Sequence, residues 1–480
     1  MPQFSRRSFL KRSTFAAGAA FTLGGPLSAR RVLGASDSIR MGVAGLNGRG
    51  GTHVGEFLGM EGVEITYLID PDTRTFKRHA EKIEKKTGRE PALVQDVRRA
   101  LEDKNLDVLT IAATNHWHAP MTIWACQAGK DVFVEKPCSH NVREGRIAVE
   151  CARKYNRIVQ HGTQGRSDRR WARLAEIARQ GLLGKLLVSY GLCYKPRDSI
   201  GFQPASPPPP EMDFNLWLGP APDQPHHANL VHYNWHWFWD FGNGDIGNQG
   251  VHQFDIARWI IPGATWPTSV ISVGGRFGYE DQAQTPNTQI SVMDFGETKL
   301  VFVVRGLKTG DFYGEKIGNI AVFEKGVVAG GDKFFPTGST VAEKLPDVSA
   351  QRGPGGNIFR NFITAVRSRR VADLDADILE AHYSAGLCHL PNISYRLAED
   401  VPFRPITKSF GDDKVAADTF ARMEEHLAGS NQLPLEKMKY RLGRMLKFDG
   451  AKERFIDCPE ADALLTRNYR APFTIPDKVA

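Results

Sequence analysis

The chain has 480 residues and a net charge of +8, and 41% of its residues are hydrophobic while 24% are charged. This balance is typical of a soluble globular protein and excludes collagen-like, disordered and membrane-bundle proteins. Six basic residues and no acidic residue lie within residues 1–35, which leaves residues 36–480 with a net charge of only +2. We therefore expect no basic surface for binding nucleic acid.

The first 35 residues have the pattern of a twin-arginine export signal. Ser5 to Lys11 reads SRRSFLK, and an uncharged stretch of small residues follows from Ser13 to Ala29. Cleavage is expected after Ala29 or Ala35. The stretch is too short and too rich in glycine to span a bilayer. We expect the mature protein to be periplasmic or otherwise exported by the twin-arginine route, which carries proteins that are already folded.

Residues 36–162 alternate between short apolar runs and helical patterns. The apolar runs, each expected to form a buried strand, are Ile39–Ala44, Val63–Ile69, Val108–Ala113 and Val132–Val134. Strands that alternate with helices in this way predict an α/β domain with a doubly wound parallel sheet.

The pattern changes after Gly162, where apolar runs follow one another with few helices between them. These runs are Leu186–Leu192, Val270–Val273, Gln289–Phe295, Lys299–Val304 and Ile320–Phe323. They predict a second, α+β domain over residues 163–408, built on an open and mainly antiparallel sheet. Residues 409–480 are expected to form a C-terminal extension that ends in an irregular tail. The proline-rich segment Ser206–Pro210 predicts a stiff surface loop.

The six cysteines lack paired C-x-x-C spacing, so we expect ordinary buried thiols, although an exported protein can form one or two disulfides.

The first predicted strand ends in a glycine-rich turn that is typical of dinucleotide binding. In the G-x-G-x-x-G pattern, glycines allow a tight turn, close approach of pyrophosphate, and packing of the helix on the strand. Gly45 and Gly50 occupy the first and third positions, and Asn47 occupies the second, beside Gly48 and Arg49. Because Asn tolerates left-handed backbone better than most residues, pyrophosphate at this helix N-terminus is still expected.

Asp70 ends the second predicted strand, where an acidic residue receives the ribose hydroxyls of NAD. A role as a helix N-cap before Pro71 is compatible with this. Arg74 leaves NADP, with its 2′-phosphate, as the less favoured alternative to NAD.

Two more loops follow buried strands and therefore lie at the same carboxyl edge of the sheet. They are Thr114–Pro120 and Val134–Pro137. The triplet Glu135-Lys136-Pro137, the glycine-rich turn, Asp70 and the segment Gly244–Asp255 (GDIGNQGVHQFD) together resemble the glucose-fructose oxidoreductase, inositol dehydrogenase and rhizopine-catabolism (Gfo/Idh/MocA) family. The last segment is similar to the family pattern D-x-G-x-H-x-x-D. The resemblance extends over nearly the whole mature chain.

The resemblance implies a Rossmann NAD-binding domain and two catalytic residues. Lys136 would orient the reacting oxygen of the substrate, and His252 would take or return its proton. The implied cofactor-binding residues are Gly45, Asn47, Gly48, Arg49, Gly50, Asp70, Thr114, Asn115, His118, Glu135 and Lys136. The implied substrate-binding residues are Lys136, Trp237, Asn248, His252 and Asp255.

Asn248 departs from the family pattern, because an acid normally stands four residues before this histidine. An amide hydrogen bonds but does not accept a proton. Three alternatives follow: Lys136 and His252 suffice, Asp245 or Asp255 contributes a carboxylate, or the subgroup performs a modified reaction.

The aromatic run Tyr233–Asp240 either lines a saccharide site or packs in the core. His232 and His236 have i, i+4 spacing but lack a carboxylate pattern, so no metal site is predicted.

Export constrains the reaction, because free nicotinamide nucleotides are not generally supplied beyond the inner membrane. The cofactor is expected to be retained and reset in place. The preferred interpretation is an oxidoreductase that oxidises one sugar or polyol and reduces a second carbonyl compound. One alternative is an NAD-dependent glycosidase that works by transient oxidation, elimination and re-reduction, as some relatives do. Another is a non-catalytic carbohydrate-binding protein.

The expected partners are a small sugar, polyol or glycoside and, from the resemblance, further copies of the chain in a homodimer or homotetramer. No nucleic acid and no stable membrane insertion are expected.

Overall fold

The structure is a computed structural model that describes residues 38–350, 353–354, 356–403, 410 and 412–479. The predicted export signal lies outside the described residues. The chain divides into Met1–Ser38 and Ile39–Ala480, and the description below concerns the second unit by itself.

The first part of this unit is a parallel sheet with the strand order β3-β2-β1-β4-β5-β6. The strands are β1 (Ile39–Ala44), β2 (Val63–Ile69), β3 (Ala92–Val94), β4 (Val108–Ile111), β5 (Asp131–Val134) and β6 (Val159–His161). The helices between them are α2 (Arg49–Leu58), α3 (Lys77–Thr87), α4 (Val97–Leu101), α5 (Asn115–Gln127) and α6 (Val142–Lys154). This order is that of a dinucleotide-binding domain, so the predicted doubly wound sheet is confirmed.

The second part is a mixed sheet with the order β13-β12-β11-β7-β10-β9-β8-β15-β14, in which β16 also pairs with β8. Its strands are β7 (Leu186–Tyr194), β8 (Ser269–Gly275), β9 (Thr288–Asp294), β10 (Lys299–Arg305), β11 (Ile317–Phe323), β12 (Gly326–Ala329), β13 (Lys333–Pro336), β14 (Glu399–Pro402), β15 (Lys439–Leu442) and β16 (Leu446–Asp449), with β17 (Arg454–Phe455) beside β16. The described pairs are antiparallel except β7 with β10. The predicted mainly antiparallel sheet is confirmed.

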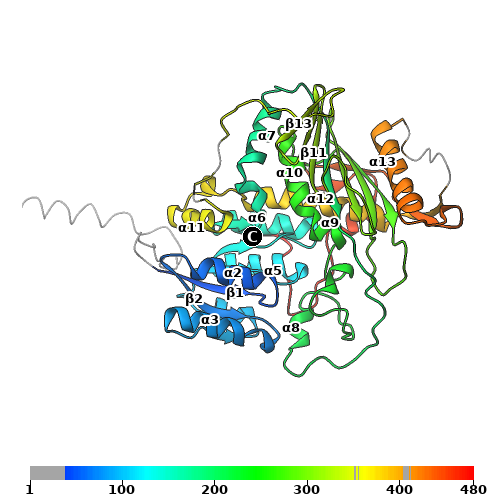
Figure 1. Cartoon of the computed structure of the whole chain (residues 1–480). Helices are drawn as coiled ribbons and strands as arrows, with labels where there is room; N and C mark the ends of the chain where they lie inside the picture. The colour runs from blue at the N-terminus through cyan, green and yellow to red at the C-terminus, as the bar shows by residue number, and fades with distance from the viewer. Residues whose placement is uncertain (1–37, 351–352, 355, 404–409, 411, 480) are drawn as a thin grey trace, which may run out of the picture. The chain divides into compact units, whose positions relative to one another are not determined.

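Helices cover both faces of this second sheet (Figure 1). The helices from here on are α7 (Arg169–Arg179), α8 (Phe214–Leu218), α9 (Gly244–Asn248), α10 (Gly250–Ile260), α11 (Ile358–Ser368), α12 (Ile378–Arg396), α13 (Lys414–Glu425) and α14 (Pro459–Ala463). α7, α10 and α12 pack on one face, where they bury alternate strand residues such as Phe302 and Val304. α13 packs on the other face, against Val301 and Val303. The two-residue alternation of the strands explains why both faces are apolar.

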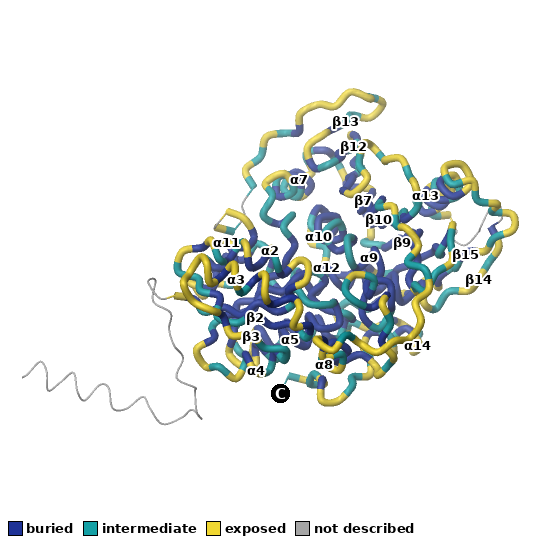
Figure 2. The backbone as a smooth tube through the Cα atoms, turned by 60° about the horizontal axis from the view of Figure 1, so that its bottom comes forward, coloured by how far each residue is buried: buried dark blue, intermediate teal, exposed yellow. Residues whose placement is uncertain are grey.

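Residues beyond 409 contribute to both parts of the unit. β15 and β16 extend the second sheet by pairing with β8. The tail then returns to the first domain, where Phe473 is 1% exposed and packs against Trp117 on α5. Figure 2 shows that α10 and α12 lie among buried backbone in the interior.

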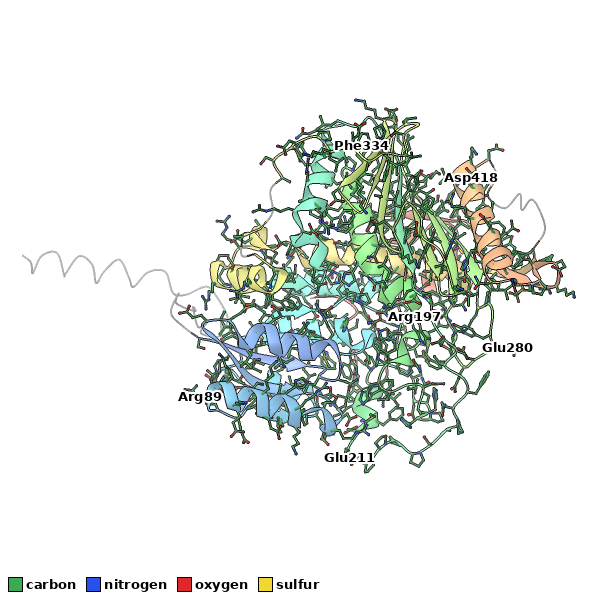
Figure 3. All side chains as sticks on the ribbon, in the orientation of Figure 1. Arg89, Arg197, Glu211, Glu280, Phe334 and Asp418 are labelled. Atoms are coloured by element: carbon green, nitrogen blue, oxygen red, sulfur yellow. The ribbon has the colours of Figure 1, made fainter. Side chains whose placement is uncertain are left out.

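The remaining sequence expectations concern loops and thiols. The segment Ser206–Pro210 is exposed except for the half-buried Pro209, and Glu211 just after it lies at the lower edge of Figure 3. The described cysteines are unpaired, and all are buried except the half-buried Cys458. No helix within the described residues combines the length and the apolar character needed to cross a membrane.

Candidate active site

A cavity of about 410 Å³ lies at the carboxyl edge of the parallel sheet. Eleven of the residues predicted from the sequence line it, and they come from segments far apart in the chain. They are Gly45, Asn47, Gly48, Arg49, Asp70, Thr114, His118, Glu135, Lys136, Asn248 and His252. The cofactor residues and the two catalytic candidates therefore share one cavity.

The glycine-rich turn closes one wall of the cavity by close backbone packing. Gly45 has a φ of +81°, and a Cβ on it would lie 2.5 Å from the Ala113 nitrogen. A Cβ on Gly50 would lie 1.7 Å from the Gly45 oxygen. Only glycine fits at these two positions. Asn47 has no positive φ, so the left-handed tolerance expected of it is not used.

Asp70 is held in place by backbone amides. The Leu46 N–H donates to Oδ2 at 2.7 Å, and the Asp72 N–H donates to Oδ1 at 2.9 Å. Burial raises the pKa of Asp70 to about 6, against the effect of these two hydrogen bonds. The carboxyl group is thus fixed at the end of β2 beside the glycine-rich turn.

The neighbouring Asp72 forms an ion pair with Arg74, the arginine that would favour NADP. Arg74 donates to both carboxylate oxygens of Asp72, with Nη2 to Oδ2 at 2.6 Å. His232 also contacts Asp72, with Nε2 2.8 Å from Oδ2. The Arg74 guanidinium is therefore engaged in a bidentate ion pair.

Glu135 links the glycine-rich helix to the end of β5. Arg49 Nε donates to its Oε1 at 2.7 Å, and His53 Nε2 lies 3.0 Å from the same oxygen. Burial alone raises the pKa of Glu135, but the contacts with His53 and Arg49 hold it well below its usual range. Gly162 leaves room for this carboxylate, because a Cβ there would lie 2.8 Å from it.

Lys136 and His252 come from the two sheet domains and line the same cavity. Lys136 Nζ donates to the Asn248 backbone oxygen at 2.7 Å and to Asn248 Oδ1 at 3.1 Å. Burial lowers the pKa of Lys136. Burial and then the charge of Lys136 lower the pKa of His252 to about 3. The imidazole is thus neutral near pH 7, with a lone pair on one ring nitrogen, and at this pKa it is a weak base.

His118 supports the loop that carries Lys136. Its Nδ1 lies 2.6 Å from the Pro137 oxygen, and its Nε2 lies 2.9 Å from the Ala113 oxygen. Because a neutral imidazole donates only one hydrogen bond, one of these carbonyls is the partner in that state. Burial lowers the pKa of His118, which favours the neutral form.

Four predicted residues do not line this cavity. Gly50 lies beneath the turn, and Asn115 is buried on α5 with its Oδ1 unpaired among the described residues. Asp255 is bound by Arg166 at 2.8 Å and by Ser384 at 2.7 Å. Trp237 lies with its ring under the Arg197 guanidinium, 4.9 Å away.

Asp245 is also committed to a structural ion pair, since Arg197 Nη2 donates to its Oδ1 at 2.6 Å. The Arg197 side chain is only 16% exposed, and Figure 3 labels it below the second sheet. Asp245 and Asp255 are thus both bound by arginines, and neither lines the cavity that includes Asn248.

Further residues line the cavity that were not assigned to the site from the sequence, apart from the run Tyr233–Asp240, for which a saccharide site and the core were both left open. They are Leu46, Ile69, Pro71, Gln95, Asp96, Val97, Ala112, Ala113, Trp117, Met121, Gln164, Leu216, Trp217, His232, Tyr233, Trp235 and His236. The aromatic run around Trp235 was the sequence feature that pointed to this part of the cavity. Its pattern did not show which of its residues lie in the core and which line the cavity. Within the described residues, no cluster of three metal-ligating side chains is found.

A second cavity, of about 480 Å³, meets the first at Gln164 and His252. It is lined by polar and aromatic side chains: Arg170, Trp171, Gln249, Gln253, Glu315, Asn319, Asp332 and Lys333. Gln164 Nε2 is buried and has no hydrogen-bond partner among the described residues. His252 therefore stands between a cofactor-sized cavity and a polar one.

Comparison with family models agrees with this architecture. Residues 39–163 match the model described as "Oxidoreductase family, NAD-binding Rossmann fold". Residues 201–428 match "Oxidoreductase family, C-terminal alpha/beta domain". Together these matches cover more than half of the chain.

Two curated relatives are similar over part of their length. Alpha-N-acetylgalactosaminidase of Shewanella oneidensis is 30% identical over 173 residues, which cover 34% of this chain and 37% of that protein. Glycosyl hydrolase family 109 protein 2 of Shewanella sp. strain ANA-3 is 33% identical over 211 residues, which cover 39% and 45%. The chain thus matches less than half the length of these relatives.

Among solved structures, the WlbA dehydrogenase from Bordetella pertussis in complex with NADH and UDP-GlcNAcA has a TM-score of 0.54. The match covers 74% of this chain and 95% of that chain, at 17% identity. At this identity the likeness shows the fold.

Proposed function

Because the chain belongs to the Gfo/Idh/MocA oxidoreductase family, we propose that it oxidises a hydroxyl-bearing carbon of a sugar or polyol with NAD. One observation carries the proposal. A single cavity holds the glycine-rich turn and Asp70 together with Lys136 and His252. A dinucleotide site and a pair of groups able to handle a hydroxyl proton thus adjoin each other.

The residues present fit NAD. The close packing of Gly45 and Gly50 leaves the turn open for pyrophosphate, and Asp70 presents a fixed carboxyl group for ribose hydroxyls. When bound, NAD supplies a nicotinamide ring that accepts a hydride from a substrate carbon and can return it. The pairing of Arg74 with Asp72 supports NAD over NADP, because that guanidinium is already engaged.

Lys136 and His252 are assigned to the substrate oxygen. His252 would accept the hydroxyl proton only as hydride leaves the same carbon, because the hydroxyl of a forming carbonyl is acidic enough for a weak base. Lys136 Nζ, held by Asn248, would donate a hydrogen bond to the same oxygen. Asn248 positions Lys136 in place of the usual acid. The polar cavity beyond His252 receives the rest of the sugar, with Trp171 available for stacking on its C–H face.

We further propose export by the twin-arginine route with NAD already bound. The support is the sequence motif from Ser5 to Lys11. If the oxidised sugar is released as the product, the retained cofactor is reset by reducing a second carbonyl compound.

A second candidate is net glycoside hydrolysis through transient oxidation, elimination and re-reduction. Its support comes from the names of the two relatives and from His236. The His236 ring lines the cofactor cavity, and its Nδ1 contacts the Tyr233 oxygen. A neutral ring that donates from Nδ1 keeps a lone pair on Nε2. For that lone pair to take the proton next to a ketone, the bound substrate has to raise the pKa of His236 from about 3.

Product analysis separates these functions. The purified protein is incubated with free sugars, polyols and p-nitrophenyl glycosides, and the products are identified by mass spectrometry. The proposed oxidoreductase yields a keto-sugar and a reduced acceptor. The glycosidase yields free sugar and nitrophenol without net redox change. If neither product forms while the sugar binds, a non-catalytic carbohydrate-binding role replaces both.

A further inference from the structure

A separate polar cavity of about 380 Å³ shares no lining residue with the cofactor cavity. It is built from segments far apart in the chain: the start of α6, residues 239–243, the C-terminal half of α12 and the tail. The lining residues on which the argument depends are Trp239, Asp240, Asn243, His389, Arg396 and Arg467. Its volume is in the range of small-molecule sites.

Two deeply buried side chains in this lining have polar atoms without a partner. Asn243 is 6% exposed, and its Nδ2 has no hydrogen-bond partner among the described residues. His389 is 3% exposed, and its Nδ1 is likewise unpaired among the described residues. Leaving a buried polar group unpaired costs about 1–3 kcal/mol. Both atoms are closed to solvent, so a ligand in the cavity bonds them only when these two lining side chains turn toward it.

Two arginines give the cavity its charge. The Arg396 guanidinium lies 5.5 Å from the centre of the Trp239 ring, and among the described residues it forms no ion pair or hydrogen bond with another side chain. Arg467 Nη1 donates to the Asp240 backbone oxygen at 2.9 Å, and its Nη2 lies 4.0 Å from Asp240 Oδ1. Asp240 is the one carboxylate among the described lining residues, and its side chain is 47% exposed. The lining therefore has a positive balance.

The other polar groups nearby are already paired. Nδ1 of His140 lies 3.3 Å from Arg467 Nη1, and its Nε2 lies 3.4 Å from the Gly242 oxygen. Glu144, which does not line the cavity, accepts from the His140 N–H and from the Tyr469 hydroxyl. Burial lowers the pKa of both His140 and His389, so the positive charge belongs to the arginines.

We propose that this cavity binds a small organic oxyanion, a molecule carrying a carboxylate or a phosphate ester. Arg396 and Arg467 contact its charged group, and Asn243 and His389 bond its other polar atoms. The cavity lining has two guanidiniums and unpaired polar groups that are mainly hydrogen-bond donors. These groups match a ligand that supplies acceptor oxygens. Because the tail forms one wall, the ligand also ties the tail to α12.

The test is calorimetric titration of the full, cofactor-bearing protein with galacturonate, galactose 6-phosphate and neutral galactose at equal ionic strength. The variant is Arg396→Gln, with Arg396→Lys as the charge-preserving comparison. The matched control is Arg99→Gln, since Arg99 is a surface arginine on α4 whose side chain is 69% exposed. Galactose reports any binding of the neutral sugar at the candidate active site.

We expect galacturonate or galactose 6-phosphate to bind more tightly than galactose, and the one that binds identifies the class of anion. Arg396→Gln weakens that binding at least about tenfold, the scale of a charge-assisted hydrogen bond. Arg396→Lys retains part of the affinity, and Arg99→Gln retains all of it. Absence of binding by both anions, or equal affinity in Arg396→Gln and the unmodified protein, contradicts the proposal. The readout is binding alone, so it is independent of the proposed reaction.

Discussion

Asp70 shows how one buried side chain couples the fold to its cofactor. Its pKa is raised to about 6 by burial, so the folded protein favours the protonated form more than the unfolded chain does. The stability associated with this group is therefore present at low pH and is lost as the pH rises through about 6. Ribose hydroxyls that donate to the carboxylate favour the charged form instead, so bound NAD offsets that loss.

The first prediction is that NAD binding weakens as the pH falls below about 6, because the carboxylate must then lose a proton on binding. Titrating nucleotide-free protein with NAD between about pH 5 and pH 8 measures this dependence. Asp70→Asn should bind NAD more weakly by about 1–3 kcal/mol and should lack the Asp70 step. A step of equal size in Asp70→Asn would assign it to another group.

The residues of the candidate site could be predicted where a sequence motif contains them. They could not be predicted where an ion pair with a residue far along the chain determines their role. Lys136 and His252 were identified through resemblance, and both line the cavity. Asp255 looked equally available in the sequence, but Arg166 is its partner and lies 89 positions away. No local pattern shows that such a carboxylate is already bound.

At the scale of elements, continuous apolar runs were the reliable signal. β1 and β2 have the bounds predicted for them. β1 is buried on both faces, β2 is a half-buried apolar run, and the two runs end at Gly45 and Asp70. β3 was not predicted, since it has three residues and two of them are exposed. β14 was missed for the same reason, as an edge strand with polar residues.

The second prediction concerns the turn between β1 and α2. Gly50→Ala should abolish NAD binding or folding, because its Cβ would collide with the Gly45 oxygen. Gly55→Ala on the same helix is the matched control. Its Cβ would meet only Lys82 Nζ at 3.5 Å, so it should be neutral or stabilise by about 0.5–1 kcal/mol. Nucleotide content and thermal unfolding of both variants give the comparison. An active Gly50→Ala with normal NAD content would contradict the described turn.

At the scale of the whole described unit, the cavity is completed by chain segments that no local pattern brings together. Trp217 and Trp235 line it from the region between β7 and β8, while the tail packs on α5. The sequence indicated a C-terminal extension that ends in an irregular tail. Its docking depends on tertiary contacts, such as that of Phe473 with Trp117, which periodicity does not encode.

The third prediction is that Phe473 anchors this tail. Phe473→Ala should lower the free energy of unfolding by about 3–5 kcal/mol, the usual cost of removing a buried phenylalanine. Phe202→Ala is the control, because Phe202 is 69% exposed and its loss should change stability by less than about 0.5 kcal/mol. Denaturant unfolding measures both. Equal effects of the two substitutions would place Phe473 outside the core.

The central claim is that Lys136 and His252 act on a sugar oxygen beside a retained NAD. The most direct measurement mixes the purified protein, without added nucleotide, with a panel of sugars, polyols and p-nitrophenyl N-acetyl-α-galactosaminide, and records the absorbance of its own nicotinamide. We predict that one of these compounds reduces the bound NAD, and that Lys136→Ala and His252→Ala each slow this step about 10²- to 10⁴-fold with the NAD content unchanged. Reduction as fast in His252→Ala as in the unmodified protein, or turnover of a substrate with no change in the bound nicotinamide, would contradict the account.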